Sequence, residues 1–153
     1  MASRKTFIRS QGFTFIEILI VLGLIMLVAG LGLFLSMDVY RSNSLHAEKN
    51  IVVSILQKAR SRAMNNINEN KHGVHFGAGK YILFTGPDWT LDPHPEDVSA
   101  TTNVTATGTT DVVFDQLTGN ASCSPAPPCA IALKNDLQTF VISINSAGQI
   151  SWH

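Results

Sequence analysis

Apolar residues in this chain form one continuous stretch near the beginning and then become periodic. Residues 13–37 are an apolar run of 25 residues in which Glu17 is the only charged residue. As a helix at about 1.5 Å per residue, this run would span roughly 37 Å, and the apolar core of a bilayer is about 30 Å thick. The pattern therefore predicts a transmembrane helix over residues 13–37, preceded by a short segment, residues 1–12.

A helical period continues after residue 37, although the sequence becomes polar. The apolar residues that recur at spacings of three, four or seven are Leu45, Val52, Ile55, Leu56, Ala59 and Ala63. No proline interrupts the stretch, and asparagines at positions 65, 66, 68 and 70 are poor helix formers. We therefore expect one continuous helix of about 53 residues, whose amphipathic continuation occupies residues 38–67.

The remaining residues, 68–153, alternate in short apolar runs that are typical of strands. The expected strands are residues 72–76, 80–84, 111–114, 130–134, 139–144 and 149–152. The first two flank Gly-Ala-Gly, and the fourth and fifth flank Asn-Asp, so two hairpins are expected. The pattern predicts an α+β fold in which a small antiparallel sheet covers the amphipathic helix.

Residues 87–110 interrupt the strand pattern and are expected to form a loop insert. The stretch is rich in turn residues, and threonine dominates its second half. Four carboxylates within it, Asp88, Asp92, Glu96 and Asp97, match no recognised calcium-loop spacing, which favours a solvated acidic loop over a calcium site. Trp89 suits either a partner contact or a cover for the sheet edge.

The charges before the apolar run indicate its orientation. Arg4, Lys5 and Arg9 have no acidic residue beside them, so the positive-inside rule places residue 1 in the cytoplasm and the distal part outside. A secretory signal peptide has a shorter apolar region with its cleavage site after that region. Here the small residue, Gly12, precedes the apolar run. A plain signal-anchor helix remains the alternative.

Residues 9–17 read Arg-Ser-Gln-Gly-Phe-Thr-Phe-Ile-Glu and lead into the apolar run. This pattern resembles the N-terminus of type IV prepilins and pseudopilins. The resemblance implies a pilin-like fold, and cleavage after Gly12 by a membrane prepilin peptidase that also N-methylates Phe13. It further implies that Glu17, then the fifth residue of the mature chain, neutralises the terminal amine of a neighbouring subunit in a filament.

The distal part resembles H-type minor pseudopilins of type II secretion and related minor pilins, with more degenerate matches. These matches lie in residues 59–63, 73–76, 81–84, 113–119 and 142–150. The resemblance implies other pilin or pseudopilin subunits and an inner-membrane assembly platform as partners, with membrane lipid around the helix before assembly. The expected location is the inner membrane as a single-pass protein with an extracytoplasmic distal domain, and then the filament. Major and minor subunits, and pilus, secretion and competence systems, are not distinguished.

The uneven charge along the chain bears on the alternative function, a minor pilin that binds DNA or a surface. The formal net charge is zero, but residues 71–153 carry three basic and seven acidic residues, a balance of −4. A DNA-binding module would need an exposed basic strip there, so the charge disfavours nucleic acid as a partner.

Cys123 and Cys129 are the only cysteines. On the outer side of a membrane such a pair favours a disulfide that closes a loop, with free thiols or a two-cysteine metal site as alternatives. The five histidines form no metal-ligand spacing, and neither a phosphate-binding glycine loop nor a Gly-x-Ser-x-Gly elbow occurs. We therefore expect no catalytic residues, metal or cofactor, and no enzymatic activity.

Overall fold

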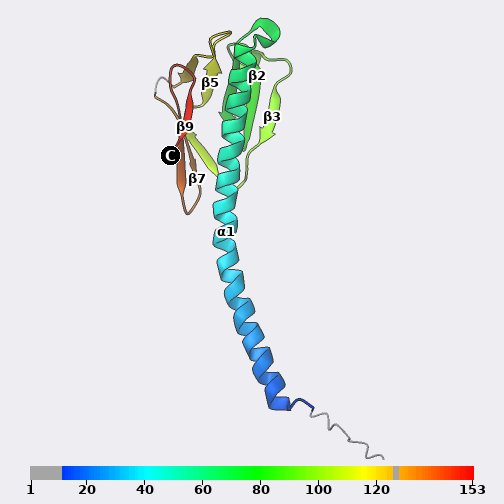
Figure 1. Ribbon diagram of the computed structural model, residues 1–153. Coiled ribbons are helices and arrows are strands. Elements are labelled where there is room, and N and C mark those ends of the chain that lie inside the picture. The colour runs from blue at the N-terminus through cyan, green and yellow to red at the C-terminus, as the bar shows by residue number, and fades with distance from the viewer. Residues whose placement is uncertain (1–11, 126–127) are drawn as a thin grey trace, which may run out of the picture. The chain divides into compact units, whose positions relative to one another are not determined.

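The computed structural model describes residues 12–125 and 128–153, and side chains other than those of residues 32–41. The chain divides into two compact units, Met1–Asp38 and Val39–His153. Helix α1, Phe15–Met64, contributes to both units (Figure 1). It begins two residues after the expected start, residue 13, and ends three residues before residue 67, where the amphipathic continuation was expected to end.

The end of α1 follows from the asparagines after it. Asn66 and Asn68 both have φ of 56°, in the left-handed region that asparagine tolerates better than most residues. Asn66 precedes the short 3-10 helix η1, Ile67–Glu69. The first strand begins at His72, three residues after the end of η1. The asparagine cluster therefore ends the helix where the sequence predicted.

The second unit contains two antiparallel sheets, which confirms the expected α+β class but not the single expected sheet. The five-stranded sheet has the order β3-β2-β1-β5-β6 and the four-stranded sheet the order β4-β7-β8-β9. The strands of the first sheet are β1, His72–Gly77; β2, Lys80–Thr85; β3, Glu96–Ser99; β5, Asp111–Phe114; and β6, Ala121–Ser124. Those of the second are β4, Thr105–Gly108; β7, Cys129–Lys134; β8, Thr139–Ile144; and β9, Ile150–Trp152.

Both expected hairpins are present. In the first, β1 and β2 pair in register from His72 opposite Thr85 to Gly77 opposite Lys80. In the second, β7 and β8 pair from Cys129 opposite Ile144 to Lys134 opposite Thr139. The alternating pattern therefore located these four strands and their pairing.

The expected loop insert, residues 87–110, contains regular structure. It holds the 3-10 helix η2, Trp89–Leu91, and the strands β3 and β4. β3 pairs with β2 at one edge of the first sheet, whereas β4 pairs with β7 at one edge of the second. The insert therefore adds an edge strand to each sheet. The chain crosses from the first sheet to the second between β3 and β4, and it returns to the first sheet between β4 and β5.

That passage depends on a close backbone approach at Gly108. Its φ is +107°, and a Cβ there would collide with the carbonyl oxygen of Ala130. The next two residues donate across the boundary, from Thr109 N to Ala130 O at 3.0 Å and from Thr110 N to Ser124 O at 2.8 Å. Glycine is thus required where the two sheets meet.

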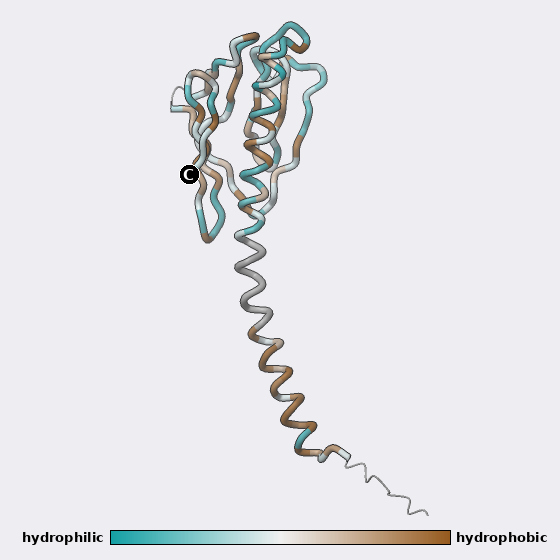
Figure 2. Tube along the Cα trace, in the orientation of Figure 1, coloured by the Kyte–Doolittle hydropathy of each residue, from teal (hydrophilic) through white to brown (hydrophobic). Residues whose placement is uncertain are grey.

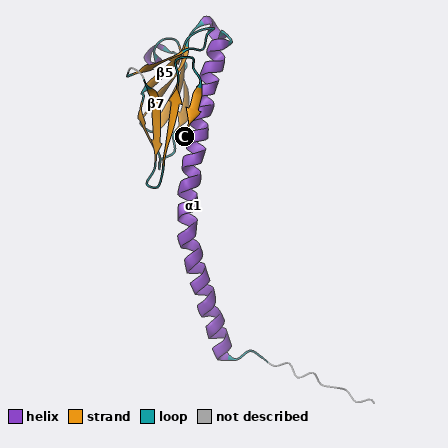
Figure 3. Cartoon of the chain, turned by 60° about the vertical axis from the view of Figure 1, so that its left-hand side comes forward, coloured by secondary structure: helices purple, strands orange, loops and turns teal. Residues whose placement is uncertain are grey.

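The core lies between the sheets and residues 45–63 of α1, and Figures 1 and 3 show the strands beside this part of the helix. All six apolar residues that the helical period selected are buried, namely Leu45, Val52, Ile55, Leu56, Ala59 and Ala63. They pack with strand residues that include Val74, Leu83, Phe114, Ile131 and Ile142. The amphipathic pattern therefore predicted the buried helix face correctly.

The first unit has a different surface. Figure 2 colours most of residues 15–31 as hydrophobic, and their large apolar side chains are exposed. Within the described residues, no helix carries an apolar stretch sufficient in length to cross a membrane. The expected transmembrane segment continues to residue 37, and its residues 32–37 lie outside the described side chains.

Candidate functional site at the start of helix α1

The start of α1 brings together the residues for which the sequence predicts processing and assembly. Gly12 and Phe13 precede the helix and Glu17 lies in its first turn, while the leader before Gly12 lies outside the described residues. A Cβ at Gly12 would meet no atom within 4 Å, and the Phe13 side chain is 81% exposed. The expected cleavage point is thus on accessible backbone outside the helix.

Thr14 caps the helix. Its Oγ1 accepts a hydrogen bond from the backbone N–H of Glu17 at 3.3 Å. Its carbonyl oxygen accepts from the N–H groups of Glu17 at 3.1 Å and Ile18 at 3.3 Å. A threonine cap supplies an acceptor to one of the otherwise unsatisfied N–H groups of the first turn. The cap fixes where α1 begins, and so fixes Glu17 three residues into it.

The residues on either side of Glu17 are large, apolar and exposed. Phe15 and Ile16 before it are 78% and 61% exposed, and Ile18 after it is 49% exposed. Among the described residues the structure gives this carboxyl group no hydrogen bond or ion pair. Its position in the first turn is electrostatically favourable, because the helix dipole places partial positive charge there. If the apolar surface were covered by another molecule, the carboxylate would need a cationic or hydrogen-bonding partner.

Cys123 and Cys129 form the expected disulfide, with an S–S distance of 2.08 Å. The bond lies in the second unit and so belongs to a different part of the chain from Gly12, Phe13 and Glu17. Cys123 is on β6 at the edge of the five-stranded sheet, and Cys129 is on β7 of the four-stranded sheet. Besides closing the expected loop, the disulfide joins the two sheets.

The four carboxylates considered as calcium ligands bind different partners. Asp88 accepts from Thr90, and Asp92 accepts from the N–H groups of Thr85 and His94. The ion-pair partners of the other two carboxylates are Lys58 and Arg62 for Glu96, and Lys80 for Asp97. In the part of the chain that the structure describes, no group of three or more histidine, cysteine or acidic residues could hold a metal ion.

Sequence reasoning missed the cap, although its signal was present. Thr14-Phe15-Ile16-Glu17 has the Thr-x-x-Glu spacing of a capping box, in which an N-cap threonine precedes a glutamate by three residues. The structure shows the bond from the Glu17 N–H to the threonine hydroxyl. Glu17 therefore occupies a position that suits helix initiation as well as the expected contact with a neighbour.

Comparison of the chain with protein-family models, with curated proteins and with solved structures finds no match.

Proposed function

We propose that this chain is a structural subunit of a type IV pilus or of a type II secretion-type pseudopilus. The observation that carries the proposal is the exposed apolar surface of residues 13–31, with the carboxyl group of Glu17 near its start. Soluble monomers rarely expose continuous apolar surface of this extent, and such a surface usually contacts protein or lipid. In the proposed filament the helices of neighbouring copies cover it.

The contrast between the two units supports this assignment. In the second unit, two sheets of the same chain bury the apolar face of the helix. In the described part of the first unit, residues 12–38, there is helix but no strand. The apolar side chains of residues 13–31 therefore depend on lipid or on other copies for burial. Before assembly, the proposed environment is the inner membrane, with the second unit on the extracytoplasmic side.

The proposed processing would supply a charged partner for the Glu17 carboxylate. Cleavage after Gly12 makes Phe13 the first residue, and its N-methylated amine carries a positive charge. Burying the Glu17 carboxylate alone would cost several kcal/mol, whereas an opposite charge from a neighbouring copy offsets much of that cost. Subunits in the correct axial stagger would form this pair, and misplaced subunits would leave both charges buried without a partner.

The test is to express the full chain with a prepilin peptidase and a filament assembly system, and to examine both processing and assembly. Mass spectrometry of the mature protein should show an N-terminus at Phe13 that carries one methyl group. Glu17→Ala should be cleaved normally, but its share of the sheared filament fraction should fall by about tenfold, the effect of losing roughly 1.4 kcal/mol per subunit contact.

Glu69→Ala is the matched control, because it removes an exposed carboxyl group from the second unit. It should be processed and assembled like the unchanged chain. An intact N-terminus in the presence of active peptidase would contradict the proposed processing. Filament yield from Glu17→Ala equal to that of the control would remove the proposed role of Glu17 in stagger.

The alternative, a minor pilin that binds DNA, gains no support from the distal lysines. Lys71 lies 2.8 Å from Asp115, and Lys80 lies 2.9 Å from Asp97. These are two of the three lysines in residues 71–153. Because acidic side chains already neutralise them, they do not form the basic strip that phosphate binding requires. A structural subunit is therefore the function we favour.

A further inference from the structure

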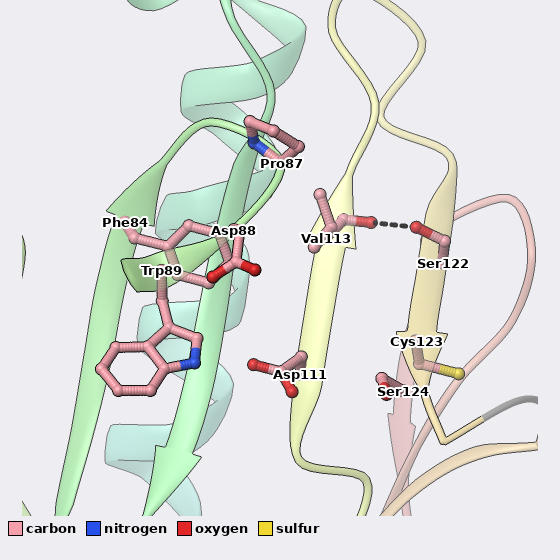
Figure 4. A pocket seen from close by; sticks show the side chains of 9 residues that line it. All are labelled: Phe84, Pro87, Asp88, Trp89, Asp111, Val113, Ser122, Cys123 and Ser124. Carbon is pink, nitrogen blue, oxygen red and sulfur yellow. Dashed lines mark hydrogen bonds between the residues drawn. The ribbon is translucent and has the colours of Figure 1, made fainter. Parts of the chain in front are cut away.

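A pocket of about 300 Å³ lies beside η2 on the five-stranded sheet (Figure 4). On β5, Val112 and Phe114 are fully buried in the core next to α1. Because successive strand residues point to opposite faces, Asp111 and Val113 lie on the other face, where they line the pocket. The pocket is therefore on the outer surface of the sheet.

The floor of the pocket is apolar and is shaped by a glycine. Phe84, which lines the pocket, is only 1% exposed although it lies on the outer face. Its register partner is Gly73, where a Cβ would collide with the Phe84 ring and would lie 2.8 Å from the carbonyl oxygen of Val112. The missing side chain lets the Phe84 ring lie across β1. With Val113 and Pro87, the ring provides an apolar surface.

One wall of the pocket is a tryptophan held by a histidine. The Trp89 indole stacks on the His75 imidazole, with ring centroids 4.3 Å apart and planes at 21°. His75 Nδ1 in turn lies 2.7 Å from Asp111 Oδ1. Figure 4 shows the indole nitrogen on the side of the ring that faces Asp111. Among the described residues this indole N–H has no hydrogen-bond partner, so it is a fixed and available donor.

Acceptors flank this donor. Asp88 Oδ1 accepts from Thr90 N at 2.9 Å and from Thr90 Oγ1 at 2.8 Å, and these bonds lower the pKa of Asp88. Its Oδ2 has no partner among the described residues and remains an available acceptor. Asp111 Oδ2 accepts from Thr110 Oγ1 at 2.8 Å. The Ser124 hydroxyl, which also lines the pocket, can donate or accept.

This arrangement selects a ligand by its hydrogen-bonding pattern. A group that meets both the Trp89 N–H and a carboxylate must accept one hydrogen bond and donate another, as a hydroxyl does. An ammonium or guanidinium group cannot accept from the N–H, and it would approach the positive edge of the indole instead of its negative face. Neighbouring hydroxyls on a ring with apolar C–H faces would satisfy the polar wall and also contact the apolar floor.

We propose that this pocket binds a single ring of a saccharide. The volume is at the small end of the range for ligand pockets, which suits one sugar ring and not an oligosaccharide chain. The proposal is independent of filament assembly, because every residue that carries it belongs to the second unit. The site gives the subunit a way to bind sugars at surfaces.

Saturation-transfer NMR on the full chain tests the proposal, in a zwitterionic detergent without a sugar headgroup. The probes are the methyl glycosides of glucose, galactose, mannose and N-acetylglucosamine, with N-acetylarginine amide as the cationic comparison. At least one glycoside should bind with a dissociation constant on the order of 1 mM, and the arginine derivative should not compete with it.

Two variants remove the proposed contacts with little change in shape. Trp89→Phe keeps an aromatic ring against His75 but removes the N–H donor. Asp88→Asn keeps an oxygen for Thr90 but replaces the available acceptor with an amide. Each should weaken glycoside binding by about tenfold, as expected for the loss of a hydrogen bond worth about 1.4 kcal/mol. Matched controls are Trp152→Phe and Asp97→Asn, which leave the pocket unchanged.

Three results would overturn the proposal. The first is the absence of binding by all four glycosides to a chain whose near-ultraviolet circular dichroism shows a folded second unit. The second is unchanged binding in both Trp89→Phe and Asp88→Asn, which would place the sugar elsewhere. The third is binding of the arginine derivative in preference to the glycosides, which would assign the pocket to a cation.

Discussion

The carboxyl group of Glu48 is fully buried between α1 and the strands, and its hydrogen bonds provide a sharp test of the packing. Tyr81 Oη on β2 donates to Glu48 Oε1 at 2.5 Å. Thr101, between β3 and β4, donates to Oε2 through its N–H at 3.2 Å and its hydroxyl at 2.6 Å. Burial raises the pKa of Tyr81, as does the bond to Glu48, so the phenol remains a donor at working pH.

The perturbation is Tyr81→Phe, which removes only the phenolic oxygen from a side chain that is 1% exposed. Glu48 Oε1 then loses its donor in a site that water does not reach. A buried acceptor left without a partner costs about 1–3 kcal/mol of folding free energy. We therefore expect the free energy of unfolding of the second unit to fall by about 2 kcal/mol.

The assay is urea denaturation of the full chain in detergent, followed by tryptophan fluorescence. Both tryptophans belong to the second unit, so the signal reports its unfolding. Thr101→Val should also destabilise the unit by about 1 kcal/mol. Thr102→Val, at the exposed neighbouring position, should change stability by less than about 0.5 kcal/mol.

A double-mutant cycle separates the hydrogen bond from a change in shape. Glu48→Met also leaves the tyrosine hydroxyl without a partner. The double variant with Tyr81→Phe should therefore lose about 1–2 kcal/mol less free energy of unfolding than the two single variants lose together. Additive effects, or a Tyr81→Phe variant as stable as the unchanged chain, would show that this bond contributes nothing to the fold.

Three further predictions concern other parts of the second unit. Replacing both Cys123 and Cys129 by alanine should lower the free energy of unfolding by about 2 kcal/mol in the same assay, because the small closed loop no longer restrains the unfolded chain. Gly148→Ala should lower the free energy of unfolding by about 3 kcal/mol, because φ is +73° and a Cβ would collide with the carbonyl oxygen of Gly119. Its control is Gly79→Ala, which has a similar φ of +77° but open space around the Cβ and should lower it by about 1 kcal/mol. Hydrogen bonds and ion pairs with α1 lower the pKa of Glu96, so Glu96→Gln should cost about 0.5 kcal/mol at pH 7. Denaturation over a pH series should show that this loss of stability shrinks as acid protonates Glu96 in the folded state, whereas a loss that stays the same as the pH falls would contradict the ion pairs.

The strands that the sequence located and those it missed differ in their place within the sheets. The four hairpin strands β1, β2, β7 and β8 pair with a neighbour on both sides, and each contains buried apolar residues. All three missed strands, β3, β4 and β6, lie at sheet edges. All their residues are half-buried or exposed, so polar residues such as threonine and serine suffice. These three edge strands therefore leave little hydrophobic pattern to find, unlike the edge strand β9, which the sequence located.

The candidate site at the start of α1 was predicted almost entirely from local sequence. Glu17 and the apolar run around it are contiguous in the chain, and the cap at Thr14 acts over only three residues. The pocket beside Trp89 could not be predicted in this way. Its carboxylates Asp88 and Asp111 are separated by 23 positions, and the register of β1 with β5 is needed to bring Asp111 to His75.

The long helix, its buried face and a preference for a disulfide between Cys123 and Cys129 could be read from the sequence alone. The first two depend on periodicity along one helix, and the third on there being two cysteines. The three-dimensional structure was needed to show that the strands form two sheets, that the disulfide joins them and that Tyr81 and Thr101 donate hydrogen bonds to Glu48. These depend on which distant segments meet, because contacts such as the Gly108 approach to Ala130 are set by packing between elements and leave no periodic pattern in either segment.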